Sequence, residues 1–147
     1  MNLFGVFDIS SAGMSVEQSQ LAVAASNLAN SRTTHAADGS VFRPLNVVLR
    51  ATSQPTSYSA IAQQLDAATL PRPVVADVLP SDAAPRLVYD PGHPDANAQG
   101  FVSYPAVDPL TTMMDLMTIS RSYEANLRAF DITRTLIQRT LEIGRNR

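Results

Sequence analysis

The stretch from Leu110 to Ile143 contains neither glycine nor proline. Its apolar side chains recur at intervals of three and four residues, which is the pattern of an α-helix. Asp108 and Pro109 come just before this stretch, and a capping carboxylate followed by proline is typical of a helix start. Gly144 follows it and predicts the helix end. Such a long helix needs a partner to cover its apolar side chains.

One apolar series on this helix repeats every seven residues, as in a coiled coil. It consists of Leu116, Tyr123, Phe130 and Ile137, and Met113, Leu127 and Leu141 are expected to fill the alternate step. Residues 3–30 predict a second helix with a matching series: Phe7, Met14, Leu21 and Leu28. We therefore expect the two terminal helices to pair. The two series are the predicted helix seam and a candidate subunit interface.

Both predicted helices carry a further apolar stripe on the face away from this seam. Its members are Ile9, Val16 and Val23 in the first helix and Met114, Ala125, Ile132, Leu136 and Ile143 in the second. One partner helix cannot cover two faces, and 147 residues provide little core in which to bury them. The pattern therefore indicates packing between subunits.

The middle of the chain predicts strands and turns. All ten prolines lie between Pro44 and Pro109, so this part cannot be another long helix. We expect strands over residues 41–49, 73–79, 86–89 and 100–104, with the last two joined as a hairpin through the turn-rich residues 90–95. Residues 52–70 fit a short amphipathic helix or a loop equally well. The expected fold class is α+β: long N- and C-terminal helices paired as a coiled-coil-like hairpin, with a small β-rich insert between them.

Composition excludes several classes of protein. The chain has no cysteine, so it has neither a disulfide framework nor a thiolate metal site. It has no run of about 18 apolar residues, which excludes an ordinary membrane-spanning helix. Asp8 and Glu17 interrupt the first apolar segment, so we expect no cleaved secretion signal. The net charge of -2 gives no reason to expect a nucleic-acid partner.

The two histidines are the first candidates for a chemical site. His35 has Asp38 nearby, and His93 has Asp90 and Asp95. Both lie in turn segments where aspartate and proline already have structural reasons to occur, and the histidines lack the spacing of metal ligands. The chain also has no nucleophile elbow and no glycine-rich phosphate loop. We predict no catalytic, cofactor-binding or metal site.

A row of arginines is the second candidate. Arg121, Arg128 and Arg139 share one face of the long helix, as they would in a nucleic-acid-binding protein. Each is followed three residues later by an acid: Glu124, Asp131 and Glu142. This spacing favours local ion pairs on a solvated or interfacial face. We expect neither a nucleic-acid partner nor a small-molecule substrate.

Two terminal segments resemble the paired motifs of bacterial flagellar axial proteins. Residues 24–30 read Ala-Ala-Ser-Asn-Leu-Ala-Asn, and residues 120–126 read Ser-Arg-Ser-Tyr-Glu-Ala-Asn. Residues 85–94 and 100–108 resemble the corresponding part of the C-type proximal rod proteins of the basal body. The motif positions in this chain are Ser26, Asn27, Leu28, Asn30, Arg121, Tyr123 and Asn126.

This resemblance implies a structural protein rather than an enzyme, exported by the flagellar type III apparatus and polymerised in the periplasm into the rod, the drive shaft of the basal body. It implies that residues 1–33 and 109–147 form a terminal helical domain of the inner tube. Residues 34–108 would form a β-rich middle domain with a variable loop at about 52–70. Implied partners are copies of the chain, the other rod proteins, the membrane-ring adaptor, the membrane ring and the export apparatus.

The alternative is another axial or helix-pairing structural or adaptor protein of the same secretion lineage. In either case Asn27, Asn30 and Asn126 stand beside apolar seams. We hypothesise that they make polar contacts that fix how the terminal helices pair or meet adjacent subunits, as a buried asparagine fixes the register of a coiled coil.

Overall fold

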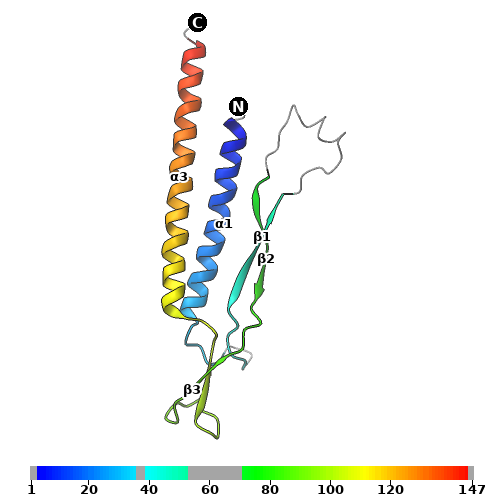
Figure 1. The fold of residues 1–147 in the computed structure, drawn as a ribbon, viewed down its shortest axis with the longest axis vertical. Coiled ribbons are helices and arrows are strands. Elements are labelled where there is room, and N and C mark those ends of the chain that lie inside the picture. The colour runs from blue at the N-terminus through cyan, green and yellow to red at the C-terminus, as the bar shows by residue number, and fades with distance from the viewer. Residues whose placement is uncertain (1–2, 36–38, 53–70, 146–147) are drawn as a thin grey trace, which may run out of the picture. The chain divides into compact units, whose positions relative to one another are not determined.

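A computed structural model describes residues 3–35, 39–52 and 71–145. In chain order, the described residues form an N-terminal helix, then four strands, then a C-terminal helix (Figure 1). The elements are α1 (Leu3–Ala29), β1 (Leu45–Ala51), β2 (Pro73–Pro80), β3 (Arg86–Tyr89), β4 (Phe101–Tyr104) and α3 (Pro109–Arg145). The ambiguous segment 52–70 lies outside the described residues except at Thr52.

Helix α3 begins where the sequence predicts it. The Asp108 carboxylate accepts hydrogen bonds from the Leu110 N–H (3.2 Å) and from the Thr111 hydroxyl (2.6 Å), so it caps two groups of the first turn. Pro109 is the first helical residue, where a missing N–H costs nothing. The helix continues through Gly144 to Arg145, so Gly144 is not the stop that the sequence predicts.

Strands β3 and β4 form the predicted antiparallel hairpin, with Arg86 opposite Tyr104 and Tyr89 opposite Phe101. The Asn97 side chain closes the connection by accepting hydrogen bonds from the N–H groups of Gln99 and Phe101, both at 2.9 Å. Gly100 has a φ of 79°, a conformation that glycine adopts without strain. The connection therefore depends on more than the aspartates and prolines of residues 90–95.

Strands β1 and β2 form a second two-stranded sheet. Hydrogen bonds extend the pairing beyond both strand ends: the Thr52 N–H donates to Arg72 C=O at 2.9 Å, and the Ser81 N–H donates to Pro44 C=O at 2.6 Å. Strand β1 starts at Leu45 rather than Val41, directly after a proline that cannot donate to a ladder.

The chain divides into two compact units. One contains residues 1–19, 49–76 and 120–147, and the other contains residues 20–48 and 77–119. In the first unit Val16 is buried in α1. In the second, Val102, Pro105 and Val107 are buried around β4 and the approach to α3, and Pro44 is buried just before β1. Each unit therefore combines parts of α1, α3 and the β insert.

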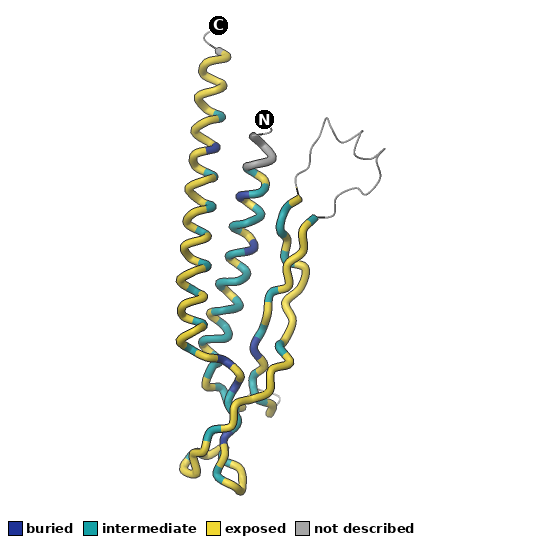
Figure 2. The backbone as a smooth tube through the Cα atoms, in the orientation of Figure 1, coloured by how far each residue is buried: buried dark blue, intermediate teal, exposed yellow. Residues whose placement is uncertain are grey.

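The prediction that the terminal helices pair as a coiled-coil-like hairpin is wrong. The residues expected at the alternate step of the seam, Met113, Leu127 and Leu141, are 48%, 42% and 69% exposed. The covered row of α3 instead consists of Thr112, Leu116, Ile119, Tyr123, Asn126, Phe130, Thr133 and Ile137 (Figure 2). Three of its four alternate positions are polar, so the row is not the apolar seam of a coiled coil.

Helix α1 departs from the prediction in a second way, because it is covered on more than one side. Over residues 7–29, for which the exposure is described, its exposed residues form a single narrow row of small and polar side chains: Asp8, Ser11, Ser15, Gln18, Ala22, Ala25 and Ala29. The β insert contributes to this cover within each unit, through Arg72 beside Asp8 and through Leu45 beside Asn27. The fold is thus α+β, with an N-terminal helix, two small two-stranded sheets and a long C-terminal helix.

Candidate functional site

The first distinctive contact joins polar side chains of α1 and α3 within one unit. The Asn126 side-chain N–H group donates to both carboxylate oxygens of Glu17 at 3.0 Å. Both residues are half-buried. A hydrogen bond to a charged acceptor stabilises more than one between neutral groups, and a half-buried carboxylate left without its donor costs energy. This contact therefore favours one axial position of the two helix segments.

Two neighbouring features surround this contact. Gly13 faces the Asn126 amide so closely that an added Cβ would lie 3.0 Å from its nitrogen. The rings of Phe7 and Phe130 pack with their centroids 3.8 Å apart and their planes tilted by 50°. A close approach at glycine and an aromatic contact thus accompany the polar pair, and together they fix the relative position of these segments.

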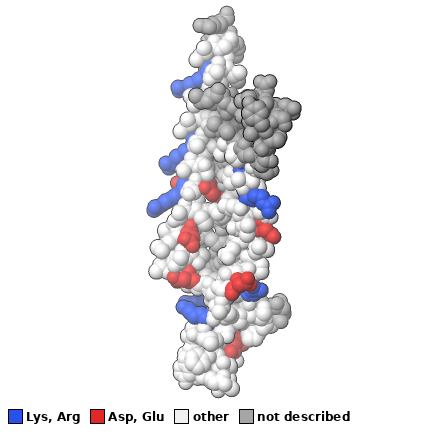
Figure 3. All heavy atoms as spheres, turned by 45° about the vertical axis from the view of Figure 1, so that its right-hand side comes forward, with Lys and Arg blue, Asp and Glu red and all other residues white. Residues whose placement is uncertain are grey.

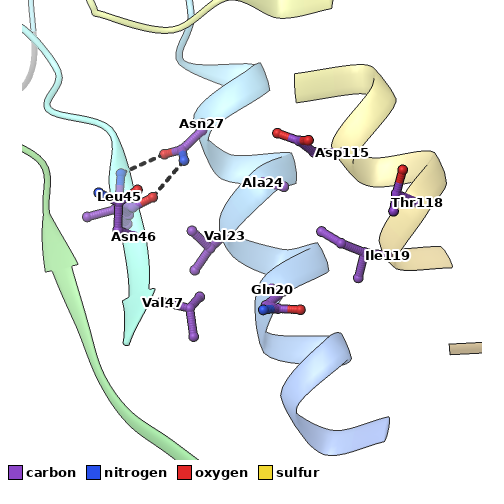
Figure 4. A pocket seen from close by; sticks show the side chains of 10 residues that line it. All are labelled: Gln20, Val23, Ala24, Asn27, Leu45, Asn46, Val47, Asp115, Thr118 and Ile119. Atoms are coloured by element: carbon purple, nitrogen blue, oxygen red, sulfur yellow. Dashed lines mark hydrogen bonds between the residues drawn. The ribbon is translucent and has the colours of Figure 1, made fainter. Parts of the chain in front are cut away.

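In the other unit, Asn27 connects α1 to the edge of β1. Its side-chain N–H donates to Leu45 C=O and its side-chain oxygen accepts from the Leu45 N–H, both at 2.8 Å (Figure 4). The amide therefore satisfies both backbone groups of Leu45, as a paired strand would. Asn30 acts locally instead, donating to Ser26 C=O at 2.9 Å beyond the last turn of α1.

A shallow groove of about 270 Å³ lies beside Asn27. Val23 and Val47 point toward one another in Figure 4, and Ile119 contributes an apolar wall from α3. Asp115 and Thr118 supply polar groups to the lining. This groove carries no cluster of nucleophile and base, so its geometry suits packing rather than catalysis.

Both histidines converge on one carboxylate. The Thr34 hydroxyl donates to Asp95 Oδ2 at 2.6 Å, and Nδ1 of His35 and of His93 lie 3.6 and 3.8 Å from the Asp95 oxygens. The Thr34 hydrogen bond holds the pKa of Asp95 below its ordinary value, and the two histidines act in the same direction. The contacts join the segment after α1 to the β3–β4 connection.

This cluster is the nearest approach to a metal site. Among the residues that the structure describes, no group of three or more acidic, histidine or cysteine side chains has an arrangement suited to a metal ion. None of the described helices combines the length and the apolar character that a membrane span requires.

Comparison with known proteins identifies the family. The model of the family described as flagellar basal body rod FlgEFG protein C-terminal matches residues 98–143. The flagellar basal-body rod protein FlgC of Escherichia coli O6:H1 is 35% identical over 144 residues, covering 98% of this chain and 99% of the relative. The chain belongs to the FlgC family of flagellar basal-body rod proteins.

The similarity extends to distant bacteria. FlgC of Bacillus subtilis is 35% identical over 150 residues, covering 99% of this chain and 100% of the relative. FlgC of Aquifex aeolicus is 35% identical over 144 residues, covering 97% of each chain. As a member of the FlgC family, the chain is a structural protein of the flagellar basal-body rod, and the rod is its location. The relatives carry the names of structural proteins.

The structure places the predicted site residues as follows. The eight seam residues, Phe7, Met14, Leu21, Leu28, Leu116, Tyr123, Phe130 and Ile137, are all half-buried. Their role at a subunit interface stays a prediction. Of the motif residues, Asn27 and Asn126 make contacts between elements, Asn30 and Ser26 make a local one, and Arg121 is exposed.

Sequence reasoning missed Glu17 and Gly13 as contact residues, and it missed Thr34 as the partner of Asp95. Glu17 entered the sequence argument only as a charge that interrupts an apolar segment. Its partner lies 109 positions away in the chain. No periodic pattern links two residues so far apart, although the polar Asn126 between Tyr123 and Phe130 indicated that some polar partner was required.

Proposed function

We propose that the chain is a subunit of the proximal rod, exported by the flagellar type III apparatus and polymerising into the drive shaft of the basal body. The observation that carries this proposal is the exposed face of α3 in a chain similar to rod proteins along its whole length. Ile132, Leu136 and Ile143 are 62%, 50% and 69% exposed. Apolar side chains that stay exposed along one helix face favour burial against another subunit.

The proposed domain organisation assigns a different role to each part of the chain. Residues 1–33 and 109–147 would contribute to the inner tube of the rod, and residues 34–108 would lie outside it, with the variable segment at about 52–70. The proposed partners are copies of the chain, the other rod proteins, the membrane-ring adaptor, the membrane ring and the export apparatus. The eight seam residues would contribute to contacts in the assembled tube.

We infer a mechanical role rather than a catalytic one. The two histidines lie beside Asp95, but their contacts hold two backbone segments together. A rod subunit has to transmit torque through its contacts with neighbours, and half-buried polar pairs such as Glu17 with Asn126 resist sliding of one helix past another. Neither a nucleic acid nor a small-molecule substrate is required for this role.

The test is complementation of a strain whose own gene of this family is deleted. The unmodified chain should restore motility and be found in isolated basal bodies by mass spectrometry. Ile132→Glu should abolish both, because it places a charge on the exposed apolar face. Ser122→Glu is the matched control, since Ser122 is also exposed on α3 but does not belong to the exposed apolar face. An unmodified chain absent from basal bodies would refute the proposal.

A further inference from the structure

Three arginines and three acids on α3 repeat with the same irregular spacing. Arg121, Arg128 and Arg139 are separated by seven and then eleven residues. The acids Glu124, Asp131 and Glu142 are separated by the same two intervals. All six side chains are exposed, and all belong to one compact unit. In the upper part of Figure 3 the basic side chains stand out from the surface at intervals.

Among the residues that the structure describes, most of these charges have no ion-pair partner. In the described part of the chain, the single ion pair of this set joins Arg128 Nη2 to Glu124 Oε2 at 3.9 Å, with the side chains 80% and 61% exposed. A pair that long and that exposed contributes little. The local pairs expected from the three-residue spacing are absent from the described residues. The charges are thus available to a partner.

The two series lie on adjacent rows of the exposed side of α3. At 3.6 residues per turn, a separation of three residues places the acids about 60° around the axis from the arginines. Both rows face away from the half-buried row that includes Tyr123 and Phe130. Exposed apolar side chains, Ile132 and Leu136 among them, flank the arginine row on the side opposite the acids. The arginine row therefore combines apolar surface with fixed positive charge.

We propose that the arginine row of α3 docks on the acid row of α3 in a second copy of this chain, with the two helices parallel and shifted by three residues. The shift corresponds to about 4.5 Å along the helix axis. At this shift Arg121, Arg128 and Arg139 of one copy all meet acids of the other: Glu124, Asp131 and Glu142. Every other parallel shift of these two series aligns at most one pair, and an antiparallel arrangement aligns at most two.

Each copy would present its arginine row to one neighbour and its acid row to another. The two surfaces in contact therefore differ, which makes the contact heterologous. Such a contact can be repeated from copy to copy and generates a ring or a helical array. Electrostatic complementarity of this kind mainly specifies the partner and the register, while the apolar side chains contribute burial. The inference rests on the proposed function, since it names the partner and register of the exposed α3 face of a rod subunit.

Disulfide cross-linking tests the register. The chain has no cysteine, so single cysteines can be introduced without background. One chain carries Arg128→Cys and a second chain carries Asp131→Cys. The two are co-expressed in the deletion strain, and the isolated basal bodies are oxidised. We expect a mixed disulfide dimer, because the two positions would lie side by side. The control mixes Arg128→Cys with Glu142→Cys, whose positions would be about 16 Å apart, too far for a disulfide.

Charge reversal tests whether the ion pairs form between copies. One variant carries Arg121→Glu, Arg128→Glu and Arg139→Glu, and the other carries Glu124→Arg, Asp131→Arg and Glu142→Arg. Each variant expressed alone should be incorporated into basal bodies about tenfold less well than the unmodified chain, which is the effect expected from the loss of three exposed ion pairs. Co-expression should restore incorporation, because each variant then meets the opposite charge on its neighbour. Pairs within one chain could not be restored by mixing.

The outcomes separate this inference from the proposed function. If the cysteine variants enter basal bodies but the 128–131 dimer does not exceed the 128–142 control, the register is wrong while the proposed function stands. Failure of mixing to rescue the two reversed variants would also overturn the inference. If the unmodified chain is itself absent from basal bodies, the proposed function fails and the inference fails with it.

Discussion

At the scale of single residues, the interaction of Gly13, Glu17 and Asn126 is the most specific polar contact between helix segments. Asn126 donates to Glu17, and Gly13 leaves just enough room for the amide. Glycine inside a helix weakens it by about 1 kcal/mol relative to alanine. Glycine at position 13 of α1 is explained by the Asn126 side chain, because a Cβ at this position would lie too close to the Asn126 amide.

This geometry predicts coupling between positions 13 and 126. Gly13→Ala alone should bring little or no gain, because the new Cβ would displace the Asn126 amide from Glu17. In an Asn126→Ala background the same substitution should stabilise α1 by about 1 kcal/mol. Asn126→Ala by itself should destabilise the local structure by about 1 to 2 kcal/mol.

Amide hydrogen exchange around both positions measures these effects, because exchange reports local opening of a helix. Gly13→Ser should behave like Gly13→Ala in direction, since any Cβ meets the same amide. An equal gain from Gly13→Ala in the presence and absence of Asn126 would show that the close approach does not constrain the helices.

At the scale of elements, the two helices differ in what holds them. The covered row of α3 contains Asn126 and Thr133, and the Thr133 hydroxyl donates back to Ala129 C=O at 2.8 Å rather than to another element. Helix α1 is covered by the β insert as well as by α3. Helix α3 carries further large apolar residues on its exposed side, Ile132 and Leu136 among them, so we expect it to depend more on assembly.

The start of α3 gives a pH prediction. The Thr111 hydroxyl, and next the Leu110 N–H, hold the pKa of Asp108 below its ordinary value of 3.8. Because the folded state lowers this pKa, the ionised carboxylate stabilises the folded form at every pH above the ordinary pKa. This stabilisation is lost as the pH falls through the lowered pKa of the folded state. We expect the first turn of α3 to loosen only at that more acidic pH.

NMR titration of the Leu110 and Thr111 amides measures this transition. Asp108→Asn is the matched control, because the amide keeps an acceptor oxygen but does not titrate, so its acid transition should be absent. A carboxyl group at position 108 that titrates at or above 3.8 would contradict the assignment of the cap.

At the scale of the whole molecule, the exposed row of α3 leads to a prediction for the free chain. Arg121, Arg128, Arg134 and Arg139 are all exposed and open to trypsin. Arg43 and Arg72 precede prolines and should resist cutting. We expect the site after Arg32, which follows α1, and the sites in α3 to be cut early in the monomer, because the terminal helices lack their partners. Arg50 and Arg86 lie in paired strands and should be protected longer.

A timed digest with fragment masses measures the order of cutting, and the same digest of isolated basal bodies is the control. Assembly should protect the terminal segments. Stable protection of Arg121 to Arg139 in the monomer would mean that α3 does not need neighbours, and would contradict this prediction.

The sequence by itself determined the elements whose signals are local. The start of α3 follows from Asp108 and Pro109, and the β3–β4 hairpin follows from apolar strands around a turn-rich connection. The row of Leu116, Tyr123, Phe130 and Ile137 is covered in the structure, because a seven-residue apolar repeat places its members on one helix face. These features depend on residues that lie close to one another in the sequence.

Only the tertiary structure decided which residues fill the alternate step, what covers α1, and which partner Asn126 and Asp95 find. From the seam residue Tyr123, a step of three residues leads to Asn126 and a step of four leads to Leu127, and both steps fit a helical repeat. The apolar pattern predicted Leu127 at the covered position, whereas in the structure Asn126 is covered and Leu127 is exposed. The partner Glu17 and the partner Thr34 come from distant parts of the chain. Contacts over such separations depend on the path of the whole chain, which no local pattern records.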